Sequence, residues 1–240
     1  MIVIPLAGLS SRFFKAGFTK PKYMLEAKGK TLFSHSVESF AHYFNTEKFL
    51  FIVRDVYDTP TFVKDEINKL GIKNAHICIL ETDTQGQAET VAKGLESLPD
   101  DDHSITIFNI DTFRPHFKYP KEISAWDGYI EVFKDAGENW SFAKPLNNNS
   151  TQVIETAEKK RISELCSTGL YYFKNRAMFN SAYTNYTQKP KNEWDKGELY
   201  VAPLYNELIT NNYKIHYHLI EREEVIFCGV PDEYYDFINA

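Results

Sequence analysis

Short apolar runs alternate with helical patterns through the first half of the chain. Four runs rich in Ile, Val, Leu and Phe predict buried strands at residues 2–6, 49–53, 76–80 and 104–110. Strands that alternate with helices are typical of a mostly parallel sheet with helices on its faces. Because three strand-to-helix crossovers follow one another, the pattern predicts a right-handed, doubly wound, Rossmann-like α/β core.

Apolar side chains at a spacing of three or four residues predict the helices between these strands. The second helix has Thr59 and Pro60 at its start and Gly71 at its end, and the third follows Gly86 and stops before Pro99. The residues expected to face the core are Phe33, Val37, Phe40 and Phe44 in the first helix, Val63, Ile67 and Leu70 in the second, and Ala88, Val91, Ala92, Leu95 and Leu98 in the third.

After Asp111 the apolar runs become shorter and their connections looser. They predict strands at residues 129–133, 141–144, 151–157, 169–173 and 214–220, and helices at 175–186, at 199–210 and from Pro231 onward. No repeat or obvious linker interrupts the chain. We therefore predict one domain over residues 1–240 with two halves, residues 1–112 and 113–240, in which the second half supplies a smaller substrate lobe that packs on the same sheet.

The composition argues against several classes of protein. Of 240 residues, 43% are hydrophobic and 25% are charged, as in ordinary globular domains, and the net charge of -6 argues against non-specific nucleic-acid binding. The first apolar run is too short for a signal peptide, and no later run approaches the roughly 18 apolar residues of a membrane span. Cys78, Cys166 and Cys228 are widely spaced in apolar runs, which predicts reduced, buried thiols in a cytoplasmic protein.

The turn after the first strand has the chemistry of a phosphate site. Small residues fill positions 7, 8, 10 and 11, and the cations Arg12, Lys20 and Lys22 follow. Backbone N–H groups in such a turn form a concavity that binds anions, and nearby cations neutralise a polyphosphate. In an acidic protein, a local cluster of cations predicts a small anionic ligand.

Polar residues also follow the other predicted strands of the first half. These residues are Arg54 and Asp55, the segment 81–86, and Asp111. Ligands of open α/β sheets bind beyond the carboxyl ends of the strands, so we expect these residues and the first turn to converge on one crevice. A phosphate loop, a polar segment and a lone carboxylate together could hold a nucleoside triphosphate with a divalent ion.

The ordered set of motifs resembles the nucleotidyltransferases that activate sugar phosphates, the nucleoside-diphosphate-sugar pyrophosphorylase family. That family has a strand, then Leu-Ala-Gly-x-Gly-Ser/Thr-Arg, a Pro-Lys some ten residues on, and a Gly-Lys before a helix. The matching residues here are Leu6-Ala7-Gly8-Leu9-Ser10-Ser11-Arg12, Pro21-Lys22, Gly29-Lys30, Gln85-Gly86-Gln87-Ala88, Asp111, Glu158-Lys159 and Gly169. The resemblance covers nearly the whole chain.

The resemblance implies a GT-A-like nucleotidyltransferase fold in which residues 1–112 bind an NTP and residues 113–240 bind a phosphorylated acceptor. The implied reaction joins the NTP to the acceptor, a sugar 1-phosphate for surface polysaccharide synthesis, and releases pyrophosphate with Mg²⁺ as cofactor. The implied site residues are Arg12 on the β and γ phosphates and Lys22 on the α phosphate, Leu6, Ala7, Gly8, Ser10, Ser11, Gln85 and Gly86 for the nucleotide, Lys144, Glu158, Lys159 and Gly169 for the acceptor, and Asp111 for the metal.

Two positions depart from the family pattern. Ser10 stands where the family has the second glycine of its loop. Cys228 stands where we expect a second metal carboxylate, which leaves Asp232 or Glu198 as possible substitutes.

Lys20 is an alternative to Lys144 for the acceptor phosphate.

Several functions stay open at this stage. The base is not readable from the sequence, and a cytidylyltransferase acting on a non-sugar phosphate is the first alternative. The others are a glycosyltransferase that uses a nucleotide sugar and a regulatory subunit that binds nucleotide without turnover. A glycosyltransferase of this fold normally has an Asp-x-Asp motif, whereas this chain has Asn109-Ile110-Asp111. A homo-oligomer is also compatible with the sequence.

Overall fold

The structure is a computed structural model that describes residues 1–240. Contacts within the chain divide it into two compact units. The N-terminal unit comprises Ile2–Asp83, Phe108–Lys118 and Glu223–Ala240, and the mid-chain unit comprises Met1, Thr84–Ile107 and Tyr119–Arg222. Each unit therefore collects segments that are far apart in the sequence, and the predicted division into halves at residue 112 stays a prediction.

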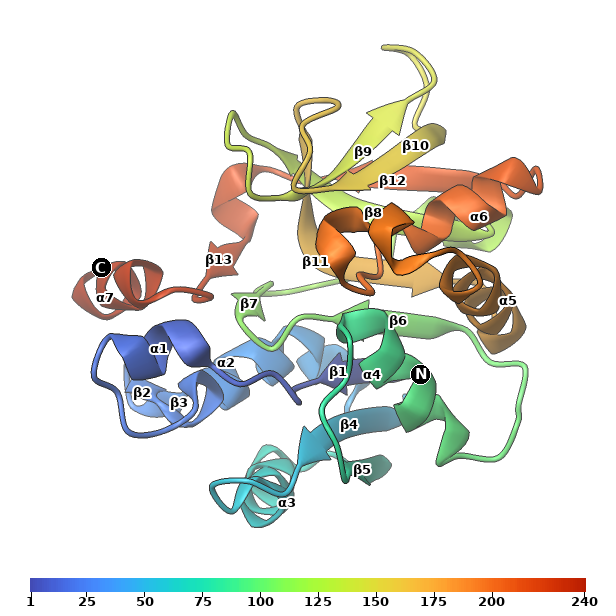
Figure 1. Ribbon diagram of the computed structural model, residues 1–240. Helices are drawn as coiled ribbons and strands as arrows, with labels where there is room; N and C mark the ends of the chain where they lie inside the picture. Colours follow the sequence, from blue (N-terminus) through green and yellow to red (C-terminus); the bar gives the residue numbers. More distant parts are fainter. The chain divides into compact units, whose positions relative to one another are not determined.

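The N-terminal unit contains the parallel strands that the first apolar runs predict (Figure 1). They are β1 (Ile2–Pro5), β4 (Phe49–Arg54) and β5 (Ala75–Leu80), in the order β1-β4-β5. Ile2 pairs with Phe49, and Phe49 pairs with Ala75. The apolar runs of β1 and β4 are buried, so burial of a continuous apolar run explains why the sequence locates these strands well.

The helices of this unit follow the predicted periodicity, with shifted ends. They are α1 (Ser11–Lys15), η1 (Lys22–Met24), α2 (Leu32–Val37), η2 (Glu38–Tyr43) and α3 (Thr59–Leu70). The residue that caps α3 is Asp58, one position before the predicted start, while Gly71 ends the helix in the left-handed conformation, as expected.

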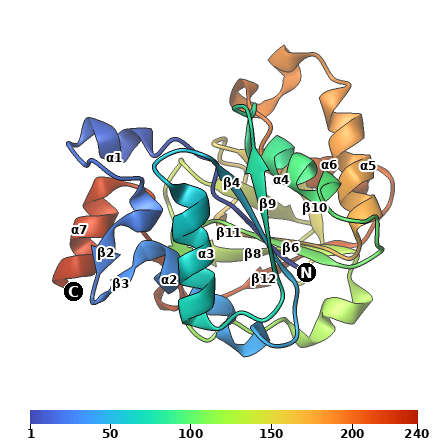
Figure 2. The ribbon, with the colours of Figure 1, turned by 90° about the horizontal axis from the view of Figure 1, so that it is seen from below.

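The C-terminal segment returns to the N-terminal unit. The strand β13 (Ile226–Phe227) pairs antiparallel with β7 (Thr112–Phe113), and the helix α7 (Pro231–Asn239) follows. Figures 1 and 2 show α7 beside α1 and beside the hairpin of β2 (Glu26–Ala27) and β3 (Lys30–Thr31). The ring of Tyr234 contacts Phe13, and its hydroxyl donates to the carbonyl of Glu26 at 2.9 Å. The C-terminal helix α7 therefore contacts α1 and β2.

The mid-chain unit contains a mixed sheet. Its strands are β6 (Ile105–Phe108), β8 (Gly128–Lys134), β9 (Ser141–Pro145), β10 (Val153–Glu158), β11 (Leu165–Phe173) and β12 (Ile215–Leu219). β11 is antiparallel to β8 and β9, β10 is antiparallel to β9, and β12 is parallel to β8. The predicted α/β class is confirmed, with its parallel core in the N-terminal unit and antiparallel pairs concentrated here.

The helices of the mid-chain unit are α4 (Gln87–Glu96), α5 (Arg176–Thr187) and α6 (Leu204–Thr210), with short turns η3 (Lys121–Ala125), η4 (Lys191–Glu193) and η5 (Asp195–Gly197). Another turn, η6 (Arg222–Glu224), follows β12. The helix expected at residues 199–210 begins only at Leu204. Leu199 lies outside the helix because its N–H and carbonyl bond to Gln85 and Ala88 instead.

Two predictions from composition can be compared with the structure. Cys78, Cys166 and Cys228 are free and buried, as predicted. None of the helices combines the length and apolar character needed to cross a membrane.

Candidate active site

The turn after β1 is built around Ser10. This residue has φ 49° and ψ 29°, in the left-handed region that favours glycine, which explains why a glycine suits the matching position of the family. The hydroxyl oxygen of Ser10 accepts the backbone N–H of Lys22 at 3.1 Å. The departure from the family pattern therefore adds a bond between the loop and the Pro21-Lys22 motif.

Lys22 and Asp111 form an ion pair in the N-terminal unit. Lys22 Nζ lies 2.5 Å from Asp111 Oδ2, and their side chains are 20% and 25% exposed. Burial acts to raise the pKa of Asp111, but the charge and hydrogen bond of Lys22, with a further contribution from Arg12, hold this pKa below its usual value. The structure thus brings together the predicted Lys22, Asp111 and Arg12, although they are far apart in the sequence.

Cys228 occupies the position beside Asp111, as the family pattern suggested. Its N–H donates to the carbonyl of Asp111 at 2.8 Å, and the side chain is fully buried. Burial, with the nearby charges of Glu233 and Asp111, raises the pKa of the thiol to about 12. At neutral pH the thiol is therefore protonated and is a poor metal ligand.

Glu233 is a carboxylate near Asp111 that the sequence interpretation missed. A Cβ atom on Gly229 would lie 3.0 Å from Asp111 Oδ2 and 3.6 Å from Glu233 Oε2, so both carboxylates flank this glycine. Glu233 Oε2 accepts the N–H groups of Gly229 and Val230 at the start of α7. The acidic first turn after Pro231 was the available signal, and Asp232, the substitute considered from the sequence, is exposed.

The potential metal ligands around Asp111 suit a metal ion that is held mainly by the phosphates of the enzyme's substrate. No group of three or more His, Cys, Asp or Glu residues is arranged to hold a metal ion by itself. Asp111 offers one partly exposed carboxylate. Mg²⁺ is commonly bound by one or two carboxylates together with substrate phosphates and water, so Asp111 fits that kind of site and not an all-protein cage.

In the mid-chain unit, Gly86 is held against the backbone of Leu199. The carbonyl of Gln85 accepts from Leu199 N–H at 2.9 Å, and the carbonyl of Leu199 accepts from Ala88 N–H at 2.8 Å. A Cβ atom on Gly86 would lie only 2.5 Å from the Leu199 oxygen, and φ is 150°. This segment therefore needs a glycine, and it presents the exposed Gln85 side chain at the start of α4.

Glu158 and Lys159 lie together at the end of β10. The carboxylate of Glu158 is buried and accepts the hydroxyl of Ser141, while Lys159 Nζ lies 3.9 Å from it and donates to the Tyr200 hydroxyl at 2.7 Å. Burial raises the pKa of Glu158, and Asp195 and Glu198 add to this rise, although Ser141 and Lys159 oppose it. A buried carboxylate kept among other acids is costly for the fold, which is typical of a ligand-binding position.

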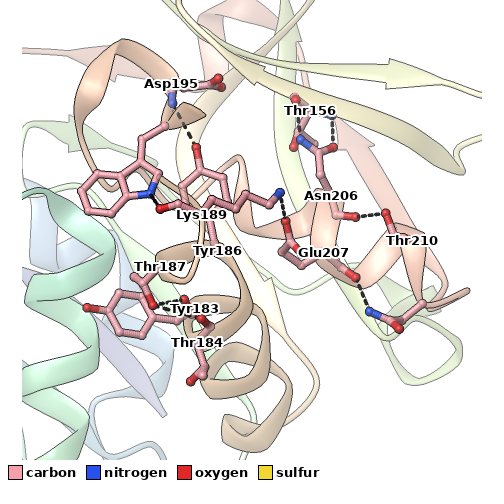
Figure 3. Close-up of polar contacts among 12 residues, drawn as sticks. Thr156, Tyr183, Thr184, Tyr186, Thr187, Lys189, Asp195, Asn206, Glu207 and Thr210 are labelled. Carbon is pink, nitrogen blue, oxygen red and sulfur yellow. Dashed lines mark hydrogen bonds and ion pairs between the residues drawn. The ribbon is translucent and has the colours of Figure 1, made fainter. Parts of the chain in front are cut away.

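A network of side chains supports this position (Figure 3). Asn206 of α6 bonds to both backbone groups of Thr156 at 2.8 Å. The Asp195 carboxylate accepts the Glu158 N–H at 2.9 Å, while the Asp195 N–H donates to the Tyr186 hydroxyl at 3.0 Å. The helices α5 and α6 thus fix the end of β10.

The structure does not bring every predicted acceptor residue to this position. Glu158 pairs with Ser141 across β9 and β10, whereas Lys144 pairs with Glu155. Lys144 is separated from Ser141 by an odd number of positions along β9. Neighbouring residues of a strand point to opposite faces, so Lys144 lies on the other face, where it forms an ion pair with Glu155 at 3.2 Å. Gly169 lies in β11 with φ 89°, at a register irregularity between Ser167 and Tyr171.

The remaining predicted site residues differ in how far they are exposed. Leu6 is buried, Ala7 is half-buried, and Gly8, Ser11, Arg12 and Lys20 are exposed in or after the first turn. Glu198 belongs to the mid-chain unit, whereas Asp111 belongs to the N-terminal unit. Convergence of the first turn with Gln85 and Gly86 on one crevice stays a prediction.

Solved structures provide the comparisons for this chain. Neither family models nor curated proteins matched its sequence. A crystal structure of the nucleoside-diphosphate-sugar pyrophosphorylase from Vibrio cholerae RC9 is 61% identical, with full coverage of both chains and a TM-score of 0.97.

More distant structures share the fold. A putative glucose-1-phosphate thymidylyltransferase from Bacillus anthracis is 16% identical over 99% of this chain and 93% of its own, with a TM-score of 0.75. The inositol-1-phosphate CTP transferase from T. maritima is 12% identical over 99% and 94%, with a TM-score of 0.73. Because the V. cholerae protein is 61% identical over the full length of both chains, this chain belongs to the nucleoside-diphosphate-sugar pyrophosphorylase family of nucleotidyltransferases.

Proposed function

We propose that this nucleotidyltransferase joins an NTP to a sugar 1-phosphate and releases pyrophosphate. The observation that carries the proposal is the meeting of Lys22, Arg12 and Asp111 beside the turn after β1. Cations next to a turn of backbone N–H groups suit a triphosphate. The V. cholerae protein, whose description names a nucleoside-diphosphate-sugar pyrophosphorylase, supports the choice of a sugar phosphate.

The reaction asks little of acid–base catalysis. An oxygen of the acceptor phosphate, already anionic at neutral pH, forms a bond to the α-phosphorus, and the bond from that phosphorus to the pyrophosphate oxygen breaks. No proton has to be removed from the attacking oxygen. The protein has to neutralise charge and align the reactants, with Arg12 on the β and γ phosphates and Lys22 on the α phosphate.

We propose Mg²⁺ as the cofactor, with Asp111 as its protein ligand. The ion would supply charge neutralisation on the phosphates, and Asp111 would hold it jointly with them. We expect titration calorimetry to detect tighter Mg²⁺ binding when NTP is present, and Asp111→Asn to weaken this binding about tenfold or more. Equal Mg²⁺ binding by the Asn variant would remove Asp111 from the metal site.

A substitution at Gly8 tests phosphate binding by the turn after β1 without affecting the stability of the fold. Its backbone is outside the left-handed region, and a Cβ atom there would meet nothing within 4 Å. The folded protein therefore does not need glycine at this position, whereas close approach of a phosphate does. We expect Gly8→Ala to leave the unfolding midpoint unchanged and to raise the KM for NTP about tenfold. An unchanged KM would contradict the placement of phosphate at this turn.

Glu158 is proposed to bind the acceptor. Because burial raises the pKa of Glu158, the folded state loses stability as the pH rises from the ordinary value of 4.5 through the folded value. Glu158→Gln removes the buried charge, so we expect it to stabilise the protein at pH 7 by on the order of 1 kcal/mol, with no gain in acid below that range. The same change should raise the acceptor KM about tenfold.

The matched control is Glu155→Gln, because Glu155 lies on the other face of the same strand. Chemical denaturation at pH 7 and pH 4 and steady-state kinetics measure the two effects. A Gln variant of Glu158 with normal acceptor KM would make this carboxylate purely structural.

The overall proposal is tested by pyrophosphate release from each of CTP, UTP, GTP and dTTP with a panel of phosphorylated acceptors. Release that requires a sugar 1-phosphate supports the proposal, and release only with CTP and a non-sugar phosphate would favour the alternative cytidylyltransferase. Nucleotide binding without turnover on any acceptor would favour a regulatory protein. Consumption of a finished nucleotide sugar would favour a glycosyltransferase.

Nucleoside-diphosphate sugars are activated donors for polysaccharide synthesis. We therefore propose that the product serves surface polysaccharide and that the enzyme acts in the cytoplasm, where NTPs are available.

A further inference from the structure

Ser10 uses its side chain in a way that the loop itself does not require. It precedes α1 with φ 49°, a conformation disfavoured for residues other than glycine. A serine before a helix commonly accepts N–H groups of that helix, but the hydroxyl of Ser10 makes no such capping bond. It accepts the N–H of Lys22 at 3.1 Å instead.

This bond completes the attachment of Lys22 to the fold. Lys22 begins the short helix η1, where the first N–H groups have no partner within the helix. The next residue, Tyr23, is 3% exposed, and its hydroxyl bonds to Thr59 at 2.8 Å. The Lys22 backbone therefore lies between the Ser10 hydroxyl and a buried anchor, and from there its ammonium reaches Asp111.

We propose that Ser10 is a positioning residue for Lys22: its hydroxyl fixes the backbone from which the Lys22 ammonium meets the phosphates of the nucleotide. The inference rests on the proposed function, in which Lys22 binds the α phosphate. A glycine at this position would adopt the same backbone conformation without the hydroxyl. Serine thus contributes a bond between two segments of the site rather than conformational freedom.

Ser10→Gly removes the hydroxyl and retains the backbone conformation, so the unfolding midpoint should stay unchanged. We expect kcat/KM for NTP to fall about tenfold, because a small displacement of a catalytic group is costly, while the acceptor KM stays unchanged. His116→Gly is the matched control, since His116 is another exposed, left-handed residue of the N-terminal unit, with φ 62°. This control should remain within about twofold of the unmodified enzyme.

A double-mutant cycle with Lys22→Ala separates positioning from direct binding. The probe is the triphosphate that supports pyrophosphate release, and its dissociation constant is measured by calorimetry. If Ser10 acts through Lys22, Ser10→Gly weakens binding about tenfold in the parent and less than about twofold in the Lys22→Ala background. Equal weakening in both backgrounds, or full activity of Ser10→Gly, overturns the inference.

The two levels of the proposal fail in different ways. If the unmodified enzyme releases no pyrophosphate from any NTP, the proposed function fails, and this inference fails with it. If the unmodified enzyme is active and Ser10→Gly behaves like it, only the positioning role is lost.

Discussion

Replacing Lys22 with alanine is expected to lower turnover by about 100- to 1,000-fold while the protein remains folded. The ammonium of Lys22 is 2.5 Å from Asp111, and the Lys22 backbone is bonded to Ser10 of the turn that we assign to the triphosphate. Loss of one preorganised group that stabilises developing charge typically has an effect of this size. The measurement is kcat for pyrophosphate release at saturating NTP and acceptor, with circular dichroism to confirm folding.

The control for this experiment is Lys15→Ala. Lys15 is exposed at the end of α1, in the same unit, and belongs to none of the motifs. We expect its replacement to leave turnover unchanged, which excludes a general effect of removing one positive charge. A fully active Lys22→Ala variant would remove Lys22 from the catalytic machinery. A variant that loses its folded circular dichroism spectrum would show that the ion pair with Asp111 is needed for folding.

The second large effect is expected at Gly86. An added methyl group would lie 2.5 Å from the oxygen, 2.6 Å from the nitrogen and 2.8 Å from the carbonyl carbon of Leu199. Backbone atoms on the opposing segment have little freedom to move away, and φ 150° with ψ 178° is a region that almost only glycine occupies. We expect Gly86→Ala to destabilise the protein by about 3 kcal/mol or more.

A matched variant separates collision from backbone strain. Gly17 has φ 93°, and a methyl group added there would meet nothing within 4 Å, so Gly17→Ala carries strain without collision. We expect it to cost about 1 kcal/mol. Denaturant unfolding of both variants measures the difference. Equal losses would mean that contact with Leu199 does not restrict this position.

The consequence for activity follows from the same contact. If the Gly86 segment moves to relieve the collision, Gln85 and the start of α4 move with it. Gly86→Ala should then raise the KM for NTP at temperatures where the variant is still folded, whereas Gly17→Ala should not. This outcome would support the assignment of Gln85 and Gly86 to the nucleotide.

Local patterns were sufficient where burial follows directly from sequence. The runs that form β1 and β4 are apolar and buried, and Gly71 ends α3 by its own conformational preference. The strand β5 forms where the sequence predicts it, but it is only partly buried and Ile79 is exposed, so the prediction of a buried strand was wrong there. Local patterns gave a wrong helix boundary where backbone groups bond to a distant segment and not within the helix. The predicted helix at residues 199–210 loses its first turn because Leu199 is bound to the segment of Gln85 and Ala88, which no periodicity reports.

The predicted acceptor residues show that a local pattern also does not predict which face of a sheet a side chain occupies. Lys144 and Glu158 are both close to the ends of predicted strands, and the resemblance to the family led us to expect both at the acceptor. Their faces depend on the parity of the pairing between β9 and β10, and the observed register places them on opposite sides. A shift of one residue would have reversed the result.

The sequence by itself determined the α/β class, because that class follows from apolar periodicity, and it predicted a phosphate site at the first turn with Arg12, Lys22 and Asp111 from motifs of charged and small residues. The tertiary structure alone decided what each of these residues meets. The ion pair of Lys22 with Asp111, the bond from the Cys228 N–H to the Asp111 carbonyl and the bond from the Lys22 N–H to the Ser10 hydroxyl join segments that are distant in the chain. Such contacts arise from the packing of several elements at once, and a local sequence pattern does not predict that packing.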